Sequence, residues 1–152
     1  MLIYLLRHGD AVAATENPKR PLSEKGLRDV DKTAHLALAR NVQVSAIYHS
    51  GILRAMETAA VLAKVLAPAL RMQVLSGLLP EDDPAIVKAE LDLINDPVAL
   101  VGHLPYLNRL AALLTTGDPK RAVIEFLPAI MACFERENQR WKIAWTSTEP
   151  TV

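Results

Sequence analysis

The chain has 152 residues, of which 51% are hydrophobic and 22% charged, values that are ordinary for a globular protein. This length suits one domain, so we expect a single domain over residues 1–152. Seventeen basic and seventeen acidic residues cancel without a basic stripe, and no nucleic-acid partner is expected. Cys133 is the only cysteine, which excludes an intrachain disulfide and a cysteine-based zinc cluster.

The sequence has no feature of a secretion signal or a membrane span. The first eight residues carry no basic region before their short apolar run, unlike a signal peptide. The most apolar long stretch, residues 51–70, contains Arg54, Glu57 and Lys64 and is therefore not a membrane span. Together with the single cysteine, these features predict a cytoplasmic protein without a membrane partner.

The first forty residues predict a strand, a loop and a helix. Leu2–Leu6 is apolar without alternation, as in a strand covered on both faces, and residues 11–22 read as a loop. Ser23 suits the N-cap of the next helix, although Gly26 in its first turn costs up to about 1 kcal/mol against alanine. The predicted apolar face of this helix consists of Leu27, Val30, Ala34 and Leu38.

Strands and helices continue to alternate through the middle of the chain. Val44–His49 predicts a second strand, and a helix follows Ser50-Gly51 to about Ala67, where Pro68 ends it. The next predicted elements are a strand over Arg71–Leu75, a helix from the acidic loop 80–84 to about Ile94, a strand over Val98–Val101, and a helix from Leu104-Pro105 to about Thr115.

The end of the chain is rich in strand-like runs, at Ala122–Phe126, Ile130–Glu135 and Trp141–Trp145. Trp141 and Trp145 stand four residues apart, so in a regular strand both would pack on one face. The overall order predicts an α/β fold, a three-layer α/β/α sandwich with a mostly parallel sheet. The last strands are expected to form an antiparallel edge.

Basic or imidazole side chains follow three of the predicted strands. Arg7 and His8 come after the first strand, Ser50 to Arg54 after the second, and His103 after the strand that ends at Val101. In open α/β sheets, ligands bind outside the carboxyl ends of the strands. If these strands are parallel neighbours, their polar ends converge on one site.

The chemistry of these residues suits a phosphoryl group. Arginine offers a planar fork of donors that matches two phosphate oxygens. A neutral imidazole nitrogen attacks phosphorus and carries the phosphoryl group, which divides one displacement into two. Two arginines and a second histidine neutralise charge without a metal, so no metal or other cofactor is expected.

Three motifs give the chain a family resemblance. The motifs resemble those of the histidine phosphatase (phosphoglycerate mutase-like) superfamily in their order and approximate spacing. They are Leu6-Arg7-His8-Gly9, the segment from Leu53 to Ala59, and Val101-Gly102-His103. The resemblance covers residues 1 to about 116. The chain also resembles the small bacterial phosphohistidine phosphatases of the SixA group, in the segments Arg7–Ala11, Arg20–Gly26 and Gly102–Pro105.

The resemblance implies a phosphoglycerate mutase-like fold and a role for each motif residue. His8 would be phosphorylated during turnover, while Arg7, Arg54 and His103 bind the phosphate and stabilise its transition state. Arg20 would help to hold phosphate or substrate, and Leu104 would lie at the same site. Gly9 fits this site because a side chain there would crowd a ligand that approaches the backbone.

Several features leave alternatives open. Gly51 stands where the family usually has proline, Glu57 stands where glutamine is common, and no long insertion follows the second helix. Glu81 and Asp82 are candidates for a general acid, but an acidic run here is also typical of a solvated helix start. His49 points either into the core or towards the site, depending on the strand alternation.

Three functions remain open at this point. The first is a phosphatase for phosphohistidine on proteins, such as a histidine-containing phosphotransfer domain, since a site without an insertion admits a protein side chain. The second is a phosphatase for small phosphate esters on the same scaffold. The third is a module that binds phosphate or phosphoproteins without turnover.

Overall fold

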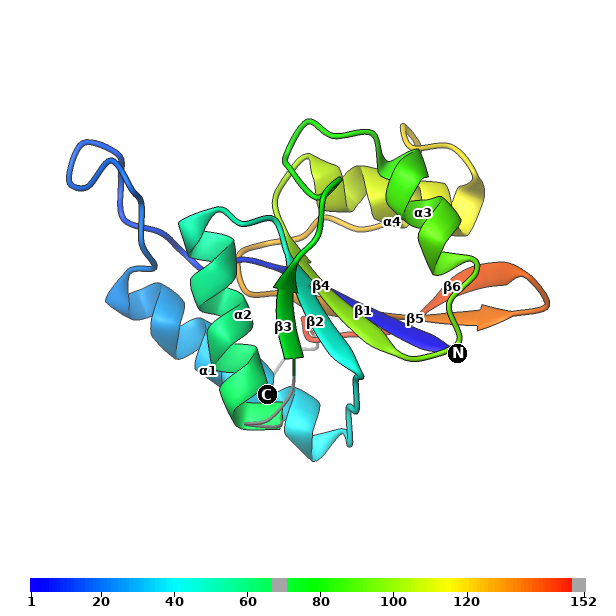
Figure 1. The fold of residues 1–152 in the computed structure, drawn as a ribbon, viewed down its shortest axis with the longest axis horizontal. Helices are drawn as coiled ribbons and strands as arrows, with labels where there is room; N and C mark the ends of the chain where they lie inside the picture. The colour runs from blue at the N-terminus through cyan, green and yellow to red at the C-terminus, as the bar shows by residue number, and fades with distance from the viewer. Residues whose placement is uncertain (67–70, 149–152) are drawn as a thin grey trace.

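The structure is a computed structural model that describes residues 1–66 and 71–148 (Figure 1). Its strands are β1 (Leu2–Arg7), β2 (Ala46–His49), β3 (Arg71–Val74), β4 (Val98–Gly102), β5 (Met131–Glu137) and β6 (Arg140–Thr146). Its helices are α1 (Glu24–Ala39), α2 (Leu53–Leu66), α3 (Pro84–Leu91) and α4 (Tyr106–Thr116). None of the helices in the described part is long and apolar enough to cross a membrane.

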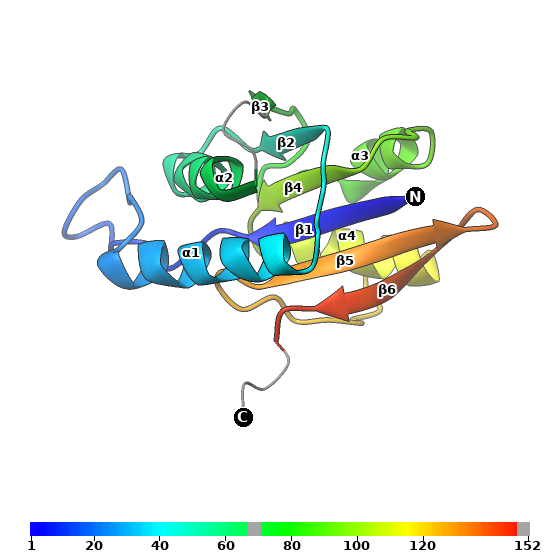
Figure 2. The ribbon, with the colours of Figure 1, turned by 90° about the horizontal axis from the view of Figure 1, so that it is seen from below.

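The strands form one sheet in the order β3-β2-β4-β1-β5-β6. The first four strands in this order are mutually parallel, while β5 and β6 add an antiparallel edge. Helices α1 and α2 cover one face of the sheet, and α3 and α4 cover the other (Figures 1 and 2). The predicted three-layer α/β/α sandwich with a mostly parallel sheet is therefore confirmed.

The apolar run of β1 is explained by its central place in the sheet. Ile3 and Leu5 pack into the cluster under α3 and α4, whereas Tyr4 and Leu6 pack into the cluster under α1 and α2. Side chains of a strand alternate between faces, so a strand covered on both sides needs apolar residues at every position. The sheet is thus anchored on both faces, and its strand ends are held rigidly.

Helix α1 packs through small residues rather than through the predicted apolar face. Leu27 and Leu38 are 44% and 47% exposed, although Val30 and Ala34 are fully buried as predicted. The buried positions of the helix are Gly26, Val30, Thr33, Ala34 and Ala37. A β-carbon at Gly26 would overlap the Asp10 carbonyl oxygen, so glycine lets α1 lie directly against the chain that follows β1.

The prediction of a strand at Ala122–Phe126 is wrong. This segment has no regular secondary structure, and side chains bind its last backbone groups. The Phe126 N–H donates to the Asn108 side chain, and the Phe126 carbonyl accepts a hydrogen bond from Arg7. Because these backbone groups are satisfied by side chains, the segment passes the end of the sheet without joining it.

The two tryptophans of β6 lie on opposite faces of the sheet, so the prediction that they share one face is wrong. A bulge lies opposite Cys133 and Phe134, where Cys133 pairs with Trp145 and Phe134 pairs with Ile143. The extra residue reverses the alternation between the two tryptophans. Trp141 packs under α4, whereas Trp145 packs against Tyr4 on the other face.

The predicted start of the second strand and the predicted end of the third helix need adjustment. Strand β2 begins at Ala46 rather than Val44, and α3 ends at Leu91 rather than Ile94. Asp92 occupies the C-cap of α3, and its carboxylate accepts hydrogen bonds from Lys88 and Trp141. The predicted end of the second helix, at Ala67 and Pro68, lies outside the described residues.

Candidate active site

The register of the parallel strands brings three strand ends together. Arg7 of β1 pairs with Gly102 of β4, and His49 of β2 pairs with Val101 of the same strand. The next residues of these strands, His8, His103 and Ser50, therefore lie at one edge of the sheet. The predicted convergence of these strand ends is confirmed, since β1, β4 and β2 are adjacent and parallel.

His8 is buried, and the position of its ring is fixed by its own turn. Its Nδ1 lies 2.7 Å from the Gly9 carbonyl oxygen. A carbonyl only accepts hydrogen bonds, so Nδ1 carries the proton and the neutral ring keeps its lone pair on Nε2. The Arg54 Nε lies 3.4 Å from this Nε2, a long contact for a hydrogen bond.

The surroundings of His8 keep its ring neutral. Burial lowers the pKa of His8 from 6.5 to about 4, although the Gly9 carbonyl opposes this change. The positive charges of Arg54, Arg7 and Arg20 are smaller contributions to the same lowering of the pKa to about 4. At neutral pH, His8 therefore presents an uncharged nucleophilic nitrogen beside three cationic side chains.

His103 completes the pair of histidines. Its ring is 1% exposed and lies with its centroid 5.1 Å from that of His8. The His103 Nε2 forms a 2.6 Å hydrogen bond with the Ser50 hydroxyl. Burial lowers the pKa of His103 to about 3, and the charges of His8, Arg54 and Arg7 act in the same direction.

The arginines approach this pair from three different segments. Arg7 ends β1 and donates from Nη1 to the Phe126 carbonyl at 2.9 Å, while Arg54 lies in the first turn of α2. Arg20 lies at the end of loop 11–22, where its Nε donates to the Val12 carbonyl at 3.1 Å. Such a group of cationic donors, gathered at strand ends, is suited to a phosphate dianion.

Two buried nitrogens of the site have no hydrogen-bond partner among the described residues. These are Arg7 Nε and His103 Nδ1. Buried polar groups are nearly always satisfied, and each exception calls for a specific explanation. An excess of donors around a buried pair of histidines indicates a site that is organised to receive an anion.

Thr58 links the turn after β1 to the helix that carries Arg54. The Gly9 N–H donates to the Thr58 hydroxyl at 3.1 Å, and this hydroxyl donates to the Arg54 carbonyl at 2.8 Å. The hydrogen bonds join the backbone next to His8 to the first turn of α2. The distance between His8 and Arg54 is therefore set by protein contacts before any ligand arrives.

Two predicted ligand-binding residues have structural contacts of their own. A β-carbon at Gly9 would lie 2.7 Å from a Val30 methyl group and 2.9 Å from the Gly26 carbonyl oxygen. Glycine is thus required there by the packing of α1, a different reason from room for a ligand. Leu104 follows His103 in the turn before α4, and its half-buried side chain packs into the core under that helix.

The candidates for a general acid lie on the loop between β3 and α3. Glu81 is exposed, and the Asp82 carboxylate accepts a hydrogen bond from the Leu79 N–H at 2.9 Å. In the described chain, no hydrogen bond or ion pair joins either carboxylate to His8, Arg54 or His103. Both residues border the same end of the sheet, and their role in proton transfer stays a prediction.

His49 is held within the turn that follows β2. Its side chain is 3% exposed, and its Nδ1 accepts a hydrogen bond from the Gly51 N–H at 3.0 Å. Burial lowers the pKa of this imidazole below its usual value. Of the two orientations left open by the sequence, the buried one is therefore observed.

Sequence reasoning included Ser50 and Thr58 in the segments of the site but did not predict their hydrogen bonds. Ser50 lies directly after β2, and Thr58 stands four residues after Arg54 on the same face of α2. The helical spacing gave a signal for Thr58. No comparable sequence signal exists for the hydrogen bond between Ser50 and His103, because this bond depends on the register of β2 and β4.

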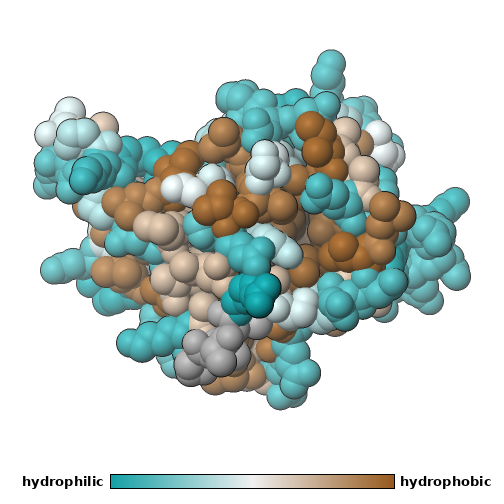
Figure 3. Space-filling model, in the orientation of Figure 1, coloured by the Kyte–Doolittle hydropathy of each residue, from teal (hydrophilic) through white to brown (hydrophobic). Residues whose placement is uncertain are grey.

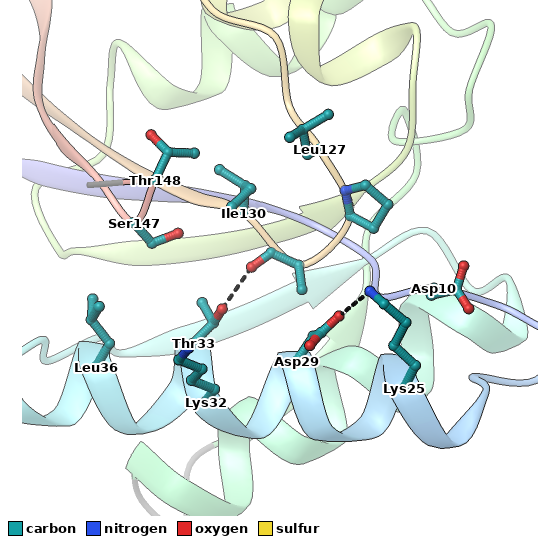
Figure 4. Close-up of a pocket in the computed structure, with 12 residues that line it drawn as sticks. Asp10, Lys25, Asp29, Lys32, Thr33, Leu36, Leu127, Ile130, Ser147 and Thr148 are labelled. Carbon is teal, nitrogen blue, oxygen red and sulfur yellow. Dashed lines mark hydrogen bonds and ion pairs between the residues drawn. The ribbon is translucent and has the colours of Figure 1, made fainter. Parts of the chain in front are cut away.

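One hollow in the described structure is separate from this cluster. It has a volume of about 550 Å³ and lies between α1 and the segments 127–130 and 147–148 (Figure 4). Thr33 donates to the Ala129 carbonyl across its floor, and Lys25 pairs with Asp29 at its rim. None of the predicted catalytic residues lines it. In the part of the chain that the structure describes, no group of three or more potential ligands is arranged to hold a metal ion.

The fold and this site define a class of protein, an α/β sandwich with two buried histidines and several arginines at its strand ends. A family model of the histidine phosphatase superfamily (branch 1) matches residues 3–79. The chain belongs to this superfamily.

The most informative relatives carry the name SixA. Phosphohistidine phosphatase SixA of Escherichia coli (strain K12) is 31% identical over 123 residues, which cover 78% of this chain and 76% of that protein. A structure of the protein histidine phosphatase SixA complexed with tungstate is similar with a TM-score of 0.84 and 25% identity, over 96% of each chain. A further SixA structure, from Agrobacterium tumefaciens, has a TM-score of 0.77 over 97% of each chain. Its 19% identity shows the shared fold alone.

Proposed function

We propose that the protein is a phosphatase in which His8 Nε2 accepts the phosphoryl group as a covalent intermediate. The observation that carries this proposal is the hydrogen bond between His8 Nδ1 and the Gly9 carbonyl. This bond leaves the lone pair of the neutral ring on Nε2, beside Arg54. The positive charges of Arg7 and Arg20 also act on the His8 ring. Residues 1–152 would form one catalytic domain, which the single sheet of the described residues supports.

The reaction proceeds in two displacements at phosphorus. In the first, the Nε2 lone pair forms a P–N bond to His8 while the bond to the leaving group breaks. In the second, water attacks the phosphorus, the P–N bond breaks, and its electron pair returns to Nε2. The proton of the attacking water leaves with the phosphate product or to solvent.

The arginines and His103 act on the charge of the transferring group. Arg7 and Arg54 hold the phosphate oxygens, and His103 lies beside the nucleophile within the same cluster. Phosphoryl transfer depends mainly on positioning and on neutralisation of the equatorial oxygens. Gly9 and Leu104 shape the turns on which the two histidines stand, and Arg20 adds a third cationic side chain.

We propose phosphohistidine on a protein, such as a histidine-containing phosphotransfer domain, as the substrate. The similarity to SixA relatives named as phosphohistidine phosphatases supports this proposal. Only residues 75–83 join β3 to α3, so this side of the site carries no long covering segment. The leaving group is an imidazole nitrogen, which departs once protonated, so Glu81 or Asp82 would assist without being essential.

The test compares the protein with His8→Ala and with His35→Ala, an exposed histidine of α1 that serves as the matched control. Each variant is incubated with a phosphorylated histidine-containing domain and with p-nitrophenyl phosphate, in the presence of EDTA. We expect release of phosphate from the protein substrate by the wild type and by His35→Ala, and none above background with His8→Ala.

The other outcomes separate the alternatives. Turnover of the aryl phosphate alone would keep the mechanism and assign the activity to small phosphate esters. Tight binding of phosphate without turnover of either substrate would contradict a phosphatase and favour a binding module. Loss of activity with EDTA, restored by a metal ion, would contradict the proposed metal-independent chemistry.

A further inference from the structure

Loop 11–22 projects from the body of the protein next to the carboxyl ends of the strands (Figure 1). Its base is closed by a bridge between Ala11 and Leu22 and by a 2.8 Å hydrogen bond from the Val12 N–H to the Pro21 carbonyl. Arg20 lies on the returning arm of the loop, two residues before Leu22. The location of its guanidinium therefore depends on how this base is attached to the rest of the protein.

The backbone at Arg20 is held in an unfavourable conformation. Its φ is +48°, in the left-handed region that non-glycine residues rarely adopt, and the next residue is Pro21, which restricts it further. Such a conformation persists only where the surroundings impose it. Local bonds contribute to this, since the Arg20 N–H donates to the Asn17 carbonyl and its Nε donates to the Val12 carbonyl.

Arg20 is close enough to act electrostatically on the site. Its charge contributes to the lowered pKa of His8, after burial and the effects of Arg54 and Arg7. Burial lowers the pKa of Arg54, and Arg20 lowers it further. Two like-charged guanidinium groups repel each other, so a contact is needed to keep Arg20 near Arg54 when no anion is bound.

Glu57 supplies such a contact. It stands three residues after Arg54 on α2, and its Oε1 accepts a hydrogen bond from the Leu22 N–H at 2.9 Å. This partly buried bond ties the base of loop 11–22 to the helix turn that begins with Arg54. We propose that Glu57 is a positioning residue, which keeps Arg20 beside His8 and Arg54 so that all three arginines bind the phosphate of the substrate together.

This inference rests on the proposed phosphatase function and assigns Glu57 a role through hydrogen bonding rather than charge. The partner of Glu57 is a backbone N–H, which needs only an acceptor oxygen. A glutamine side chain offers such an oxygen at the same reach, whereas alanine offers none. Glu57→Gln and Glu57→Ala therefore separate the hydrogen bond from the carboxylate charge.

The experiment measures kcat and KM for p-nitrophenyl phosphate and the inhibition constant of inorganic phosphate. The variants are Glu57→Ala, Glu57→Gln, Arg20→Ala and the double variant Glu57→Ala/Arg20→Ala. We expect Glu57→Ala to raise the KM and the phosphate inhibition constant roughly ten-fold, the scale of one hydrogen bond to a charged group, with a smaller change in kcat. Glu57→Gln should restore values near those of the wild type.

The double variant decides whether Glu57 acts through Arg20. If it does, Glu57→Ala adds nothing to the defect of Arg20→Ala, because the positioned side chain is already absent. Independent effects, in which the two defects multiply, would overturn the proposal. Wild-type phosphate affinity in Glu57→Ala or in Arg20→Ala would also overturn it. A failure of the proposed function is distinguishable, because His8→Ala would then retain turnover whatever happens at Glu57.

Discussion

Ser50 illustrates how the site is built at the scale of single residues. The sequence places this residue in the turn before Arg54 without predicting a contact for it, and in the structure its hydroxyl is the hydrogen-bond partner of His103 Nε2 at 2.6 Å. The same oxygen accepts the Ile52 N–H at 3.3 Å, which holds the turn before α2. Ser50 therefore joins the orientation of the second histidine to the start of the helix that carries Arg54.

Ser50→Ala should weaken both the fold and the activity. Loss of the hydroxyl leaves the buried His103 Nε2 without this partner, which costs about 1–3 kcal/mol. We expect a lower free energy of unfolding in urea titrations and a roughly ten-fold fall in kcat/KM, from a less fixed His103 ring. Ser45→Ala is the matched control, because Ser45 precedes β2 and its exposed hydroxyl donates to Pro97. Equal effects of the two substitutions would contradict a specific role for Ser50.

At the scale of elements, the contact between α1 and the chain after β1 decides where His8 stands. Gly9 and Gly26 face each other closely across this contact, where added β-carbons would overlap Val30, the Gly26 carbonyl or the Asp10 carbonyl. Ser23 caps the helix by accepting the Gly26 N–H, and its hydroxyl donates to the Asp10 carboxylate at 2.6 Å. The first turn of α1 is thus fixed to the residues that follow His8.

Gly26→Ala should therefore destabilise the protein, although alanine has a higher helix propensity than glycine. Propensity alone predicts a gain of about 1 kcal/mol, whereas overpacking against the Asp10 backbone costs about 1–3 kcal/mol. We expect a net loss in the free energy of unfolding and a raised KM, measured by urea titration and steady-state kinetics. Arg28→Ala, an exposed substitution in the same helix, should stay within about 0.5 kcal/mol. A stabilised Gly26→Ala variant would show that this close contact does not exist.

The same contact shows how far the sequence could predict the elements. Apolar runs and turn residues predicted the order of strands and helices, because those patterns are local. The same patterns predicted the three strand ends that carry arginines or histidines. The exposed Leu27 and Leu38 were not predictable, because the helix rotates to bring Gly26 against Asp10. The wrong prediction of a strand at Ala122–Phe126 has a similar cause. Phe126 is hydrogen-bonded by Arg7 and Asn108, which are distant from it in the sequence.

For the whole molecule, the buried neutral histidines link stability to pH. Burial lowers the pKa of His8 to about 4 and of His103 to about 3, while an unfolded histidine titrates near 6.5. Between pH 6.5 and about 4 the unfolded state therefore binds more protons, and the free energy of unfolding falls as the pH falls. For His8 alone, this change amounts to about 3 kcal/mol over the window.

His8→Asn should remove part of this dependence. The amide does not titrate, so the variant should lose less stability than the wild type between pH 6.5 and 4. Urea titrations at several pH values, without phosphate in the buffer, measure this difference. An equal slope for both proteins would show that His8 does not titrate at a depressed pKa in the folded state.

A single-turnover trap of the phosphorylated enzyme tests most directly whether His8 is the nucleophile. The protein is mixed with a radiolabelled phosphohistidine-containing domain, quenched in alkali within one turnover, digested and mapped. We expect an acid-labile, alkali-stable phosphoryl group on His8 Nε2 of the wild type, and no labelled peptide from His8→Ala. Label on another residue, or turnover without any labelled His8 at early times, would contradict His8 as the nucleophile.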